Sequence, residues 1–103
     1  MEEMASGWVG ILSAELHFPE AHSLKEKRMS VRSAREQLRN RFGAAVAEVD
    51  HHDVWQRTRL TVAVVTREAG EAQRLLADAE RYLASREWEL GHLERELVTL
   101  DDE

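Results

Sequence analysis

The stretch Ser-Leu-Lys-Glu-Lys-Arg at residues 23–28 carries the residue types and spacing best suited to chemistry. Ser23 and Glu26 have the spacing of a capping box, in which each side chain accepts a hydrogen bond from the backbone N–H of the other residue. The stretch therefore begins a helix, and unpaired N–H groups with a partial positive charge gather at such a start. Three cations lie there as well, which makes a candidate anion site, although nearby carboxylates would also neutralise it. These cations are Lys25, Lys27 and Arg28.

A second polar segment, His-His-Asp-Val-Trp-Gln-Arg at residues 51–57, lies between two stretches with strand character. It is too polar for a core and too short for a helix of its own, so we interpret it as a long hairpin loop. Trp55 has two interpretations: it stacks on a base or a partner, or it folds over the end of the sheet and closes the core. The candidate binding residues of this loop and the preceding strand are Asp50, Asp53, Trp55, Gln56 and Arg57.

The cations of these two segments allow two hypotheses. In the first, the cations of residues 23–28 and Arg57 bind an anion such as phosphate. In the second, the same cations form an internal ion-pair network with Asp50 and Asp53. We favour the second, because it needs no ligand that the sequence fails to name. It predicts that replacing Asp53 by Ala lowers stability by about 1–3 kcal/mol.

Metal binding is a weaker interpretation of the histidines near this loop. His51, His52 and Asp53 are ligand types, and His17 or His92 could join them. Adjacent residues at a strand end point to opposite sides, however, so two neighbours rarely chelate one ion. We therefore assign no metal ligand.

Acid–base catalysis is a weaker interpretation of the carboxylates at Glu48 and Asp50. They are expected on one face of a strand, as a general acid and base would be. Carboxylates so placed more often pair with arginines, here Arg57 or Arg59. The chain has no catalytic signature, so we assign no catalytic residue and no cofactor, and an enzyme is the less favoured interpretation.

Charge is divided unevenly along the chain. Residues 24–42 hold seven cations against two carboxylates, and Arg32 among them completes the candidate binding residues. From residue 68 onward, eleven carboxylates face four arginines. The net charge of −6 argues against non-specific nucleic-acid binding, whereas the basic helix is a candidate interaction face.

Composition excludes several classes of protein. The 103 residues include no cysteine, which rules out disulfides and thiolate metal sites. No apolar run approaches the roughly 20 residues of a membrane span. The first residues, Met1 to Met4, lack the basic and apolar regions of a signal peptide. We therefore expect a soluble cytoplasmic protein with a single domain over residues 1–103, of which 1–6 form a flexible tail.

Six elements must position the candidate residues. Alternating apolar residues predict strands, and apolar residues at helical spacing predict helices. The last segment also fits a helix, but we choose a strand with a bulge near Gly91 or His92. Without it the first strand, whose start is apolar on both faces, would be a sheet edge. The predicted strands are 7–18, 44–50, 59–66 and 88–100, and the predicted helices are 24–42 and 71–85.

The order of these elements predicts an α+β fold of the ferredoxin-like βαββαβ type. Right-handed crossovers then give a four-stranded antiparallel sheet, in the order 4-1-3-2, with both helices on one face. This topology brings residues 23–28 and 51–57 to the same end of the sheet. The other face lacks helices and carries an apolar patch, from which we expect a homodimer. The residues of this patch are Val9, Ile11, Ala63 and Val65.

Three blocks of sequence resemble those of the YlxP-like family of small bacterial proteins, domain of unknown function 503. The blocks are residues 23–28, Val-Ala-Glu-Val-Asp at 46–50 and Asp-Val-Trp-Gln-Arg at 53–57. The resemblance implies a ferredoxin-like fold. Because genes of the family often lie beside translation and ribosome-maturation genes, it also implies a connection with the ribosome. The chain departs from the family pattern at Arg35, where an aliphatic residue is usual. Its C-terminal part is also unusually acidic, which counts against RNA contact there.

Three functions follow from these observations. The favoured one is a non-catalytic protein associated with RNA or the ribosome through the basic helix and the adjoining loop. The second is a small-anion-binding or enzymatic module at the end of the sheet formed by residues 23–28 and 51–57. The third is a homodimeric scaffold that associates through the open sheet face. RNA binding on that face is disfavoured, because its predicted central positions Thr61, Ala63 and Val65 offer no aromatic side chain.

Overall fold

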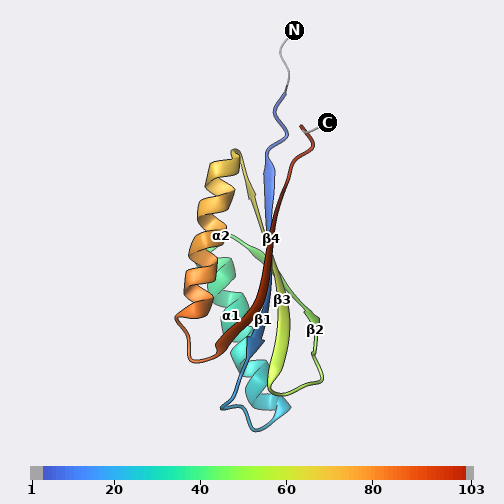
Figure 1. Cartoon of the computed structure of the whole chain (residues 1–103), viewed down its shortest axis with the longest axis vertical. Coiled ribbons are helices and arrows are strands. Elements are labelled where there is room, and N and C mark those ends of the chain that lie inside the picture. Colours follow the sequence, from blue (N-terminus) through green and yellow to red (C-terminus); the bar gives the residue numbers. More distant parts are fainter. Residues whose placement is uncertain (1–3, 102–103) are drawn as a thin grey trace.

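Two helices cover one face of a four-stranded antiparallel sheet in the computed structural model, which describes residues 4–101 (Figure 1). The strand order is β2-β3-β1-β4, so the predicted ferredoxin-like arrangement and strand order are confirmed. The long central strands β1 and β3 pair along their whole length, from Trp8 with Thr66 to His17 with Arg57. The elements are β1 (Trp8–His17), α1 (Leu24–Phe42), β2 (Ala45–Asp50), β3 (Arg57–Thr66), α2 (Ala69–Ala84) and β4 (Glu89–Val98).

The core lies between the sheet and the helices. Alternate residues of β1, Leu12, Ala14 and Leu16, are fully buried, because successive side chains of a strand point to opposite faces. The helices add apolar stripes, which include Leu38 of α1 and Leu76 of α2. Each fully buried leucine contributes about 1.5–3 kcal/mol to stability, so this layer supplies most of the driving force for folding.

Helix α1 begins and ends with the signals that the sequence predicts. The Ser23 hydroxyl accepts a hydrogen bond from the Glu26 backbone N–H at 3.1 Å. The reciprocal bond differs by one residue, since the Glu26 carboxylate accepts from His22 at 3.4 Å rather than from Ser23. Gly43 ends the helix with a φ of 63°, and its N–H donates to the Arg39 carbonyl at 3.0 Å.

Helix α2 and strand β3 each start two residues earlier than predicted. Helix α2 starts at Ala69, earlier than the predicted residue 71, and its N-cap Glu68 makes no side-chain capping bond. This missing cap explains why no sequence signal marks the start. Strand β3 starts at Arg57 rather than residue 59, because pairing with His17 of β1 extends it beyond the apolar stretch.

The C-terminal segment is a strand, as predicted, and it contains the predicted bulge. Strand β4 pairs Leu93 with Ala14 and Leu90 with Leu16, so two residues of β4 oppose one of β1 between these pairs. Those two residues are Gly91 and His92, which identifies them as the bulge.

The predicted flexible tail is described only in part. Residues 1–3 lie outside the described residues. The backbone N–H of Ser6 donates to the Asp101 carboxylate at 3.0–3.1 Å, so the two ends of the described chain are joined (Figure 1).

Candidate functional site

Residues 23–28 and the loop after β2 meet at one end of the sheet, as the topology predicts, and Lys27 joins them. Its side chain is fully buried, and its Nζ donates to the Glu48 Oε2 atom at 2.6 Å and to the His51 carbonyl oxygen at 2.9 Å. The Thr58 hydroxyl donates to the same Glu48 oxygen. These contacts link α1, β2, the loop and β3, so Lys27 is part of an internal network and is not available to a ligand.

Glu48 is the carboxylate partner of this network, and its charge is stabilised there. Burial alone would raise the pKa of Glu48, but hydrogen bonds from Lys27 and Thr58 and the charge of Lys27 hold the pKa below its ordinary value. The ion pair is therefore maintained at neutral pH.

The prediction that Asp50 and Asp53 neutralise the cations of residues 23–28 is not supported by the contacts. Asp50 accepts a hydrogen bond from the backbone N–H of His51 at 2.8 Å, which makes it a loop-forming residue. Asp53 is exposed and forms no ion pair with another described residue. The predicted internal ion pair is therefore present at this end of the sheet, but its carboxylate is Glu48 rather than Asp50 or Asp53.

Glu48 and Asp50 do not share a face of β2, contrary to expectation. Glu48 lies opposite Leu60, whose side chain is buried under the helices, whereas Asp50 lies opposite Arg59 on the other face. A bulge between them accounts for this, because one extra residue reverses the side on which the next side chain projects. The two carboxylates cannot act as an acid–base pair on one face.

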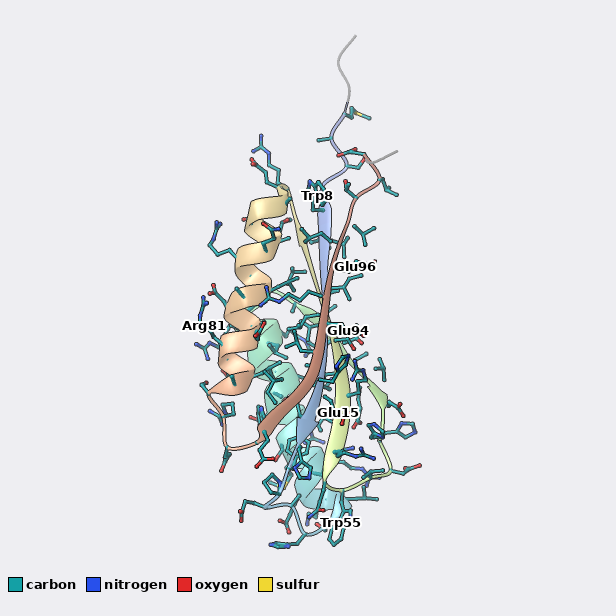
Figure 2. All side chains as sticks on the ribbon, in the orientation of Figure 1. Trp8, Glu15, Trp55, Arg81, Glu94 and Glu96 are labelled. Atoms are coloured by element: carbon teal, nitrogen blue, oxygen red, sulfur yellow. The ribbon has the colours of Figure 1, made fainter. Side chains whose placement is uncertain are left out.

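The remaining residues of the loop point mainly to solvent. Trp55 is 45% exposed, so it does not close the core as one interpretation required, and Figure 2 shows it at the tip of the molecule. Gln56 supports the loop through its backbone carbonyl, which accepts from the Phe18 N–H at 2.8 Å. Arg57 lies 3.8 Å from Glu15 of β1. Lys25 is exposed and forms no ion pair within residues 4–101.

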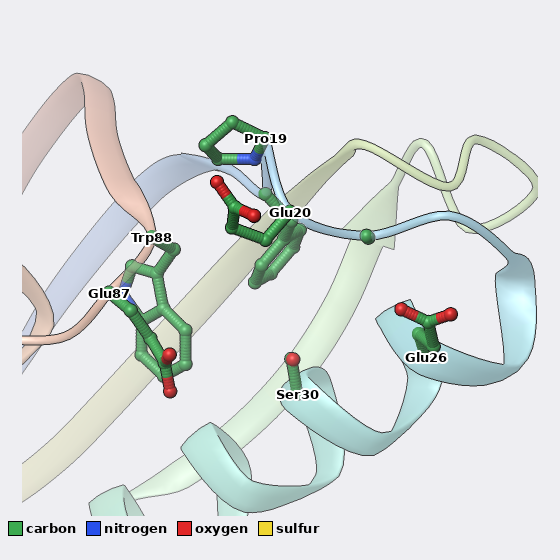
Figure 3. A pocket seen from close by; sticks show the side chains of 8 residues that line it. Pro19, Glu20, Glu26, Ser30, Glu87 and Trp88 are labelled. Carbon is green, nitrogen blue, oxygen red and sulfur yellow. The ribbon is translucent and has the colours of Figure 1, made fainter.

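A pocket of about 180 Å³ lies beside the start of α1 (Figure 3). Phe18 and Trp88 form apolar walls, and three carboxylates, Glu20, Glu26 and Glu87, line it. Their negative charge opposes the partial positive charge of the helix start. The pocket is therefore unsuited to a small anion, which weakens the hypothesis of an anion-binding or enzymatic module at this end.

Besides Lys25 at the start of α1, further cations without an ion pair to any described residue lie along the helix. Arg28, Arg32, Arg35 and Arg39 line an open groove of about 450 Å³ between α1 and β2, and Val31, Glu36 and Glu48 complete its lining. We call this the basic groove. Within residues 4–101, none of its four arginines has a carboxylate within 4.0 Å. Arg35 also has a buried Nε atom that no described residue satisfies.

The sequence contains the signal for both surfaces of α1. The buried stripe is Lys27, Val31, Ala34 and Leu38, and the stripe of the basic groove is Arg28, Arg32, Arg35 and Arg39. Both follow the spacing of one helix face, and they are displaced by one residue, or about 100° around the axis. Sequence reasoning included Arg28 and Arg32 among the binding residues. It missed Arg35 and Arg39 because it centred the site on the helix start.

Three of the five histidines, His17, His51 and His92, lie within 4.0 Å of a carboxylate. His17 is 3.2 Å from Glu89, and His92 is 3.7 Å from Glu94. In the described part of the chain, no group of three or more His, Asp or Glu side chains could hold a metal ion. Neither helix of the described residues combines the length and the hydrophobicity that a membrane span requires.

Comparisons with known proteins found a family, a relative and a solved structure that are similar to this chain. A family model described as "Protein of unknown function (DUF503)" matches residues 9–95. The chain is 31% identical to a protein of Bacillus subtilis (strain 168) described as "Uncharacterized protein YlxP", over 78% of this chain and 98% of that protein. Among solved structures it is similar to the de novo designed protein Ferredog-Diesel, with 14% identity, a TM-score of 0.43 and coverage of 91% of both chains.

Proposed function

The chain belongs to the DUF503 family, and from this premise we propose that it is a non-catalytic, cytoplasmic bacterial protein that binds RNA, within or near the ribosome, through the basic groove. The observation that carries this proposal is the row of four arginines with no carboxylate partner among the described residues. Unpaired arginines are costly to keep close together unless an anion neutralises them, and phosphate suits the planar guanidinium best.

The length of the basic groove favours a polyanion over a small anion. From Arg28 to Arg39 the helix rises about 16 Å, at about 1.5 Å per residue. One phosphate group cannot contact cations over this distance, whereas an RNA backbone presents a series of phosphates along it. The net charge of −6 repels RNA from the rest of the surface, so the attraction is concentrated in the groove.

Trp55 is a second feature that suits RNA. It lies exposed at the end of the molecule where α1 begins (Figure 2). An RNA strand that follows the groove beyond Arg28 would approach this indole ring, and an unpaired base can stack on it. We therefore expect single-stranded RNA to bind more tightly than a duplex of the same length.

The test compares two triple variants that remove the same charge from different helices. One is Arg32→Ala with Arg35→Ala and Arg39→Ala in the groove of α1. The other is Arg67→Ala with Arg74→Ala and Arg81→Ala, at or just before α2, where all three residues are exposed. Fluorescence anisotropy with a labelled single-stranded RNA 12-mer then measures the affinity of each as a function of salt.

We expect the groove variant to bind at least tenfold more weakly than the wild type. Its dependence of log K on log salt should be shallower by about 2, since each lost phosphate contact removes about 0.7 from the slope for single strands. The control variant should stay within about twofold of the wild type. Equal losses in the two variants, or no RNA binding by the wild type at low salt, would contradict the proposal.

The ribosomal part of the proposal has its own test. A tagged copy of the protein is isolated from its native cell at low and at high salt. We expect ribosomal particles to accompany the wild type at low salt only, and not to accompany the groove variant. Failure of this experiment with intact RNA binding in vitro would remove the ribosome as partner and leave the RNA interaction standing.

A further inference from the structure

On the sheet face that carries no helix, one end of the strands is apolar and the other end is charged. At one end Val9 of β1 lies between Val65 of β3 and Val98 of β4 in register. Val65 is 77% exposed and Val98 is 40% exposed, and Ile11 with Ala63 forms the next row. We call these five residues the apolar end. Exposed valines side by side on an open sheet face are typical of a surface covered by a partner.

Within the charged end, positive and negative side chains lie on different strands. The β3 side carries the cations Arg57 and Arg59, and the β4 side carries the carboxylates Glu89 and Glu94, whereas Glu96 lies beside Ile11 in register, at the β4 edge of the apolar end. Glu15 of β1 lies next to Arg59 in register, and Figure 2 shows Glu15, Glu94 and Glu96 following one another along the sheet. A surface that is basic along one strand and acidic along the next strands is complementary to its own copy turned around the strand direction.

The ion pairs on this face leave the cations open to a further partner. Arg59 lies 3.8 Å from Glu15 and 3.8 Å from Glu94, and Arg57 lies 3.8 Å from Glu15. These separations exceed the length of a hydrogen bond, so the guanidinium donors are not used up by the carboxylates of their own chain. Arg59 is nevertheless only 19% exposed, which holds its side chain against the sheet.

We propose that two copies of this chain associate face to face through these sheets, about a two-fold axis that runs parallel to β1 and β3 and passes between them. This axis places β3 of one copy over β1 of the other. The apolar end then meets the apolar end, and Arg59 meets Glu15 of the partner subunit twice, as an isologous interface requires. A two-fold axis across the strands would instead place the valines over the charged end, which burial of unpaired charge disfavours.

The size of the face sets the expected strength of this dimer. A strand of 10 residues is about 33 Å long, and the outer strands of a four-stranded sheet are about 14 Å apart, so the face covers on the order of 500 Å². Stable interfaces bury about 800 Å² per partner. We therefore expect a reversible dimer with a dissociation constant in the micromolar range, rather than an obligate one.

A pair of charge reversals tests the axis itself. In a homodimer of the Glu15→Arg variant, each new arginine would face Arg59 of the partner subunit. In a homodimer of the Arg59→Glu variant, each new glutamate would face Glu15 of the partner subunit. In a mixture of the two variants, every cross-subunit pair again joins opposite charges. Sedimentation velocity should show each variant as a monomer and the mixture as a dimer. Protein concentrations of about 5–200 µM span the range in which such a dimer forms.

The control is the pair Glu80 and Arg95, whose ion pair lies on the helix side of β4. Reversing both charges there should leave self-association unchanged. Circular dichroism confirms that each variant is folded. If Glu15→Arg or Arg59→Glu unfolds, Val65→Asp tests the same face, since Val65 is largely exposed and its replacement should abolish the dimer without disturbing the core.

Three outcomes would overturn the proposal. The first is a wild type that stays monomeric up to about 200 µM, which is far above the expected dissociation constant. The second is a mixture of the two charge variants that fails to associate. The third is a control pair whose reversal weakens the dimer as much as the charge variants do. The proposed binding of RNA does not depend on any of these results, because the basic groove lies between α1 and β2 on the helix side.

Discussion

At the scale of single residues, the best-defined interaction in this protein is a buried ion pair that is structural. Lys27 occupies a position of the core stripe of α1, together with Val31, Ala34 and Leu38. A buried ammonium group is tolerated only when its hydrogen bonds and charge are satisfied, and Glu48 with the His51 carbonyl satisfies them. The pair thereby specifies how the end of β2 docks on the helix.

The role of Glu48 predicts a loss of stability that depends on pH. Glu48→Gln should lower the free energy of unfolding by about 3 kcal/mol at pH 7, because it removes one charge of a buried pair. The folded-state pKa of Glu48 lies below its ordinary value of 4.5, so its contribution is complete above pH 4.5 and is lost as the pH falls through the folded-state value. The difference between wild type and variant should therefore shrink in acid.

Urea denaturation over a series of pH values measures this difference. Asp53→Asn is the matched control, since Asp53 is an exposed carboxylate with no ion pair among the described residues. It should change stability by less than about 0.5 kcal/mol at pH 7. A larger loss of stability from Asp53→Asn than from Glu48→Gln would mean that Asp53 of the loop, and not Glu48, is the stabilising carboxylate.

At the scale of elements, α1 performs two tasks with one periodicity. One stripe packs on the sheet and the next stripe, displaced by one residue, lines the basic groove. The orientation of the arginines is therefore set by the burial of their neighbours, since a helix cannot rotate one stripe without the other. The ends of the helix must be well defined for this arrangement, and Ser23 and Gly43 define them.

The backbone conformations of two glycines, one at the end of α1 and one in α2, predict opposite effects on stability for the same substitution. Gly43 has a φ of 63°, so Gly43→Ala should cost about 1 kcal/mol of stability although no atom lies within 4 Å of the added methyl group. Gly70 lies inside α2 with equally open space, so Gly70→Ala should raise stability by about 0.5–1 kcal/mol. Thermal and urea unfolding of both variants would measure the effects, and the same sign at both sites would contradict the backbone argument.

At the scale of the whole molecule, the two proposed surfaces lie on different sides of the sheet. The helices lie on one side of the sheet (Figure 1), and the basic groove lies on that side between α1 and β2. The apolar end and the divided charges lie on the other side. A face-to-face dimer would carry its two grooves on opposite outer surfaces. Each subunit could then contact RNA without competing with the dimer interface.

This separation predicts that losing the dimer does not weaken the individual RNA site. Val65→Asp should shift the chain to a monomer while its affinity for a short single-stranded RNA stays within about twofold of Gln73→Asp, an exposed α2 control with the same added charge. Anisotropy with an RNA 12-mer measures one site, because this length is too short to bridge two grooves on opposite surfaces. A loss as large as that of the groove variant would mean that the two surfaces are coupled.

Local patterns in the sequence determined the elements and their order. Alternation identified β1 and β3, helical spacing and a cap identified α1, and the bulge of β4 was predicted from its change of phase near Gly91. Given those elements, the handedness of crossovers was sufficient for the strand order. The meeting of residues 23–28 with the loop after β2 followed from that topology alone.

Only the tertiary structure decided which charges are buried, paired or free. A bulge in β2 sends Glu48 to the helix side and Asp50 to the other side, so the partner of Lys27 could not be chosen from the sequence. The same applies to the arginines of α1, whose freedom depends on which carboxylates lie within reach after folding. The physical reason is that charge pairing is a property of distances between remote residues and of local burial, whereas propensity and periodicity act between near neighbours along the chain.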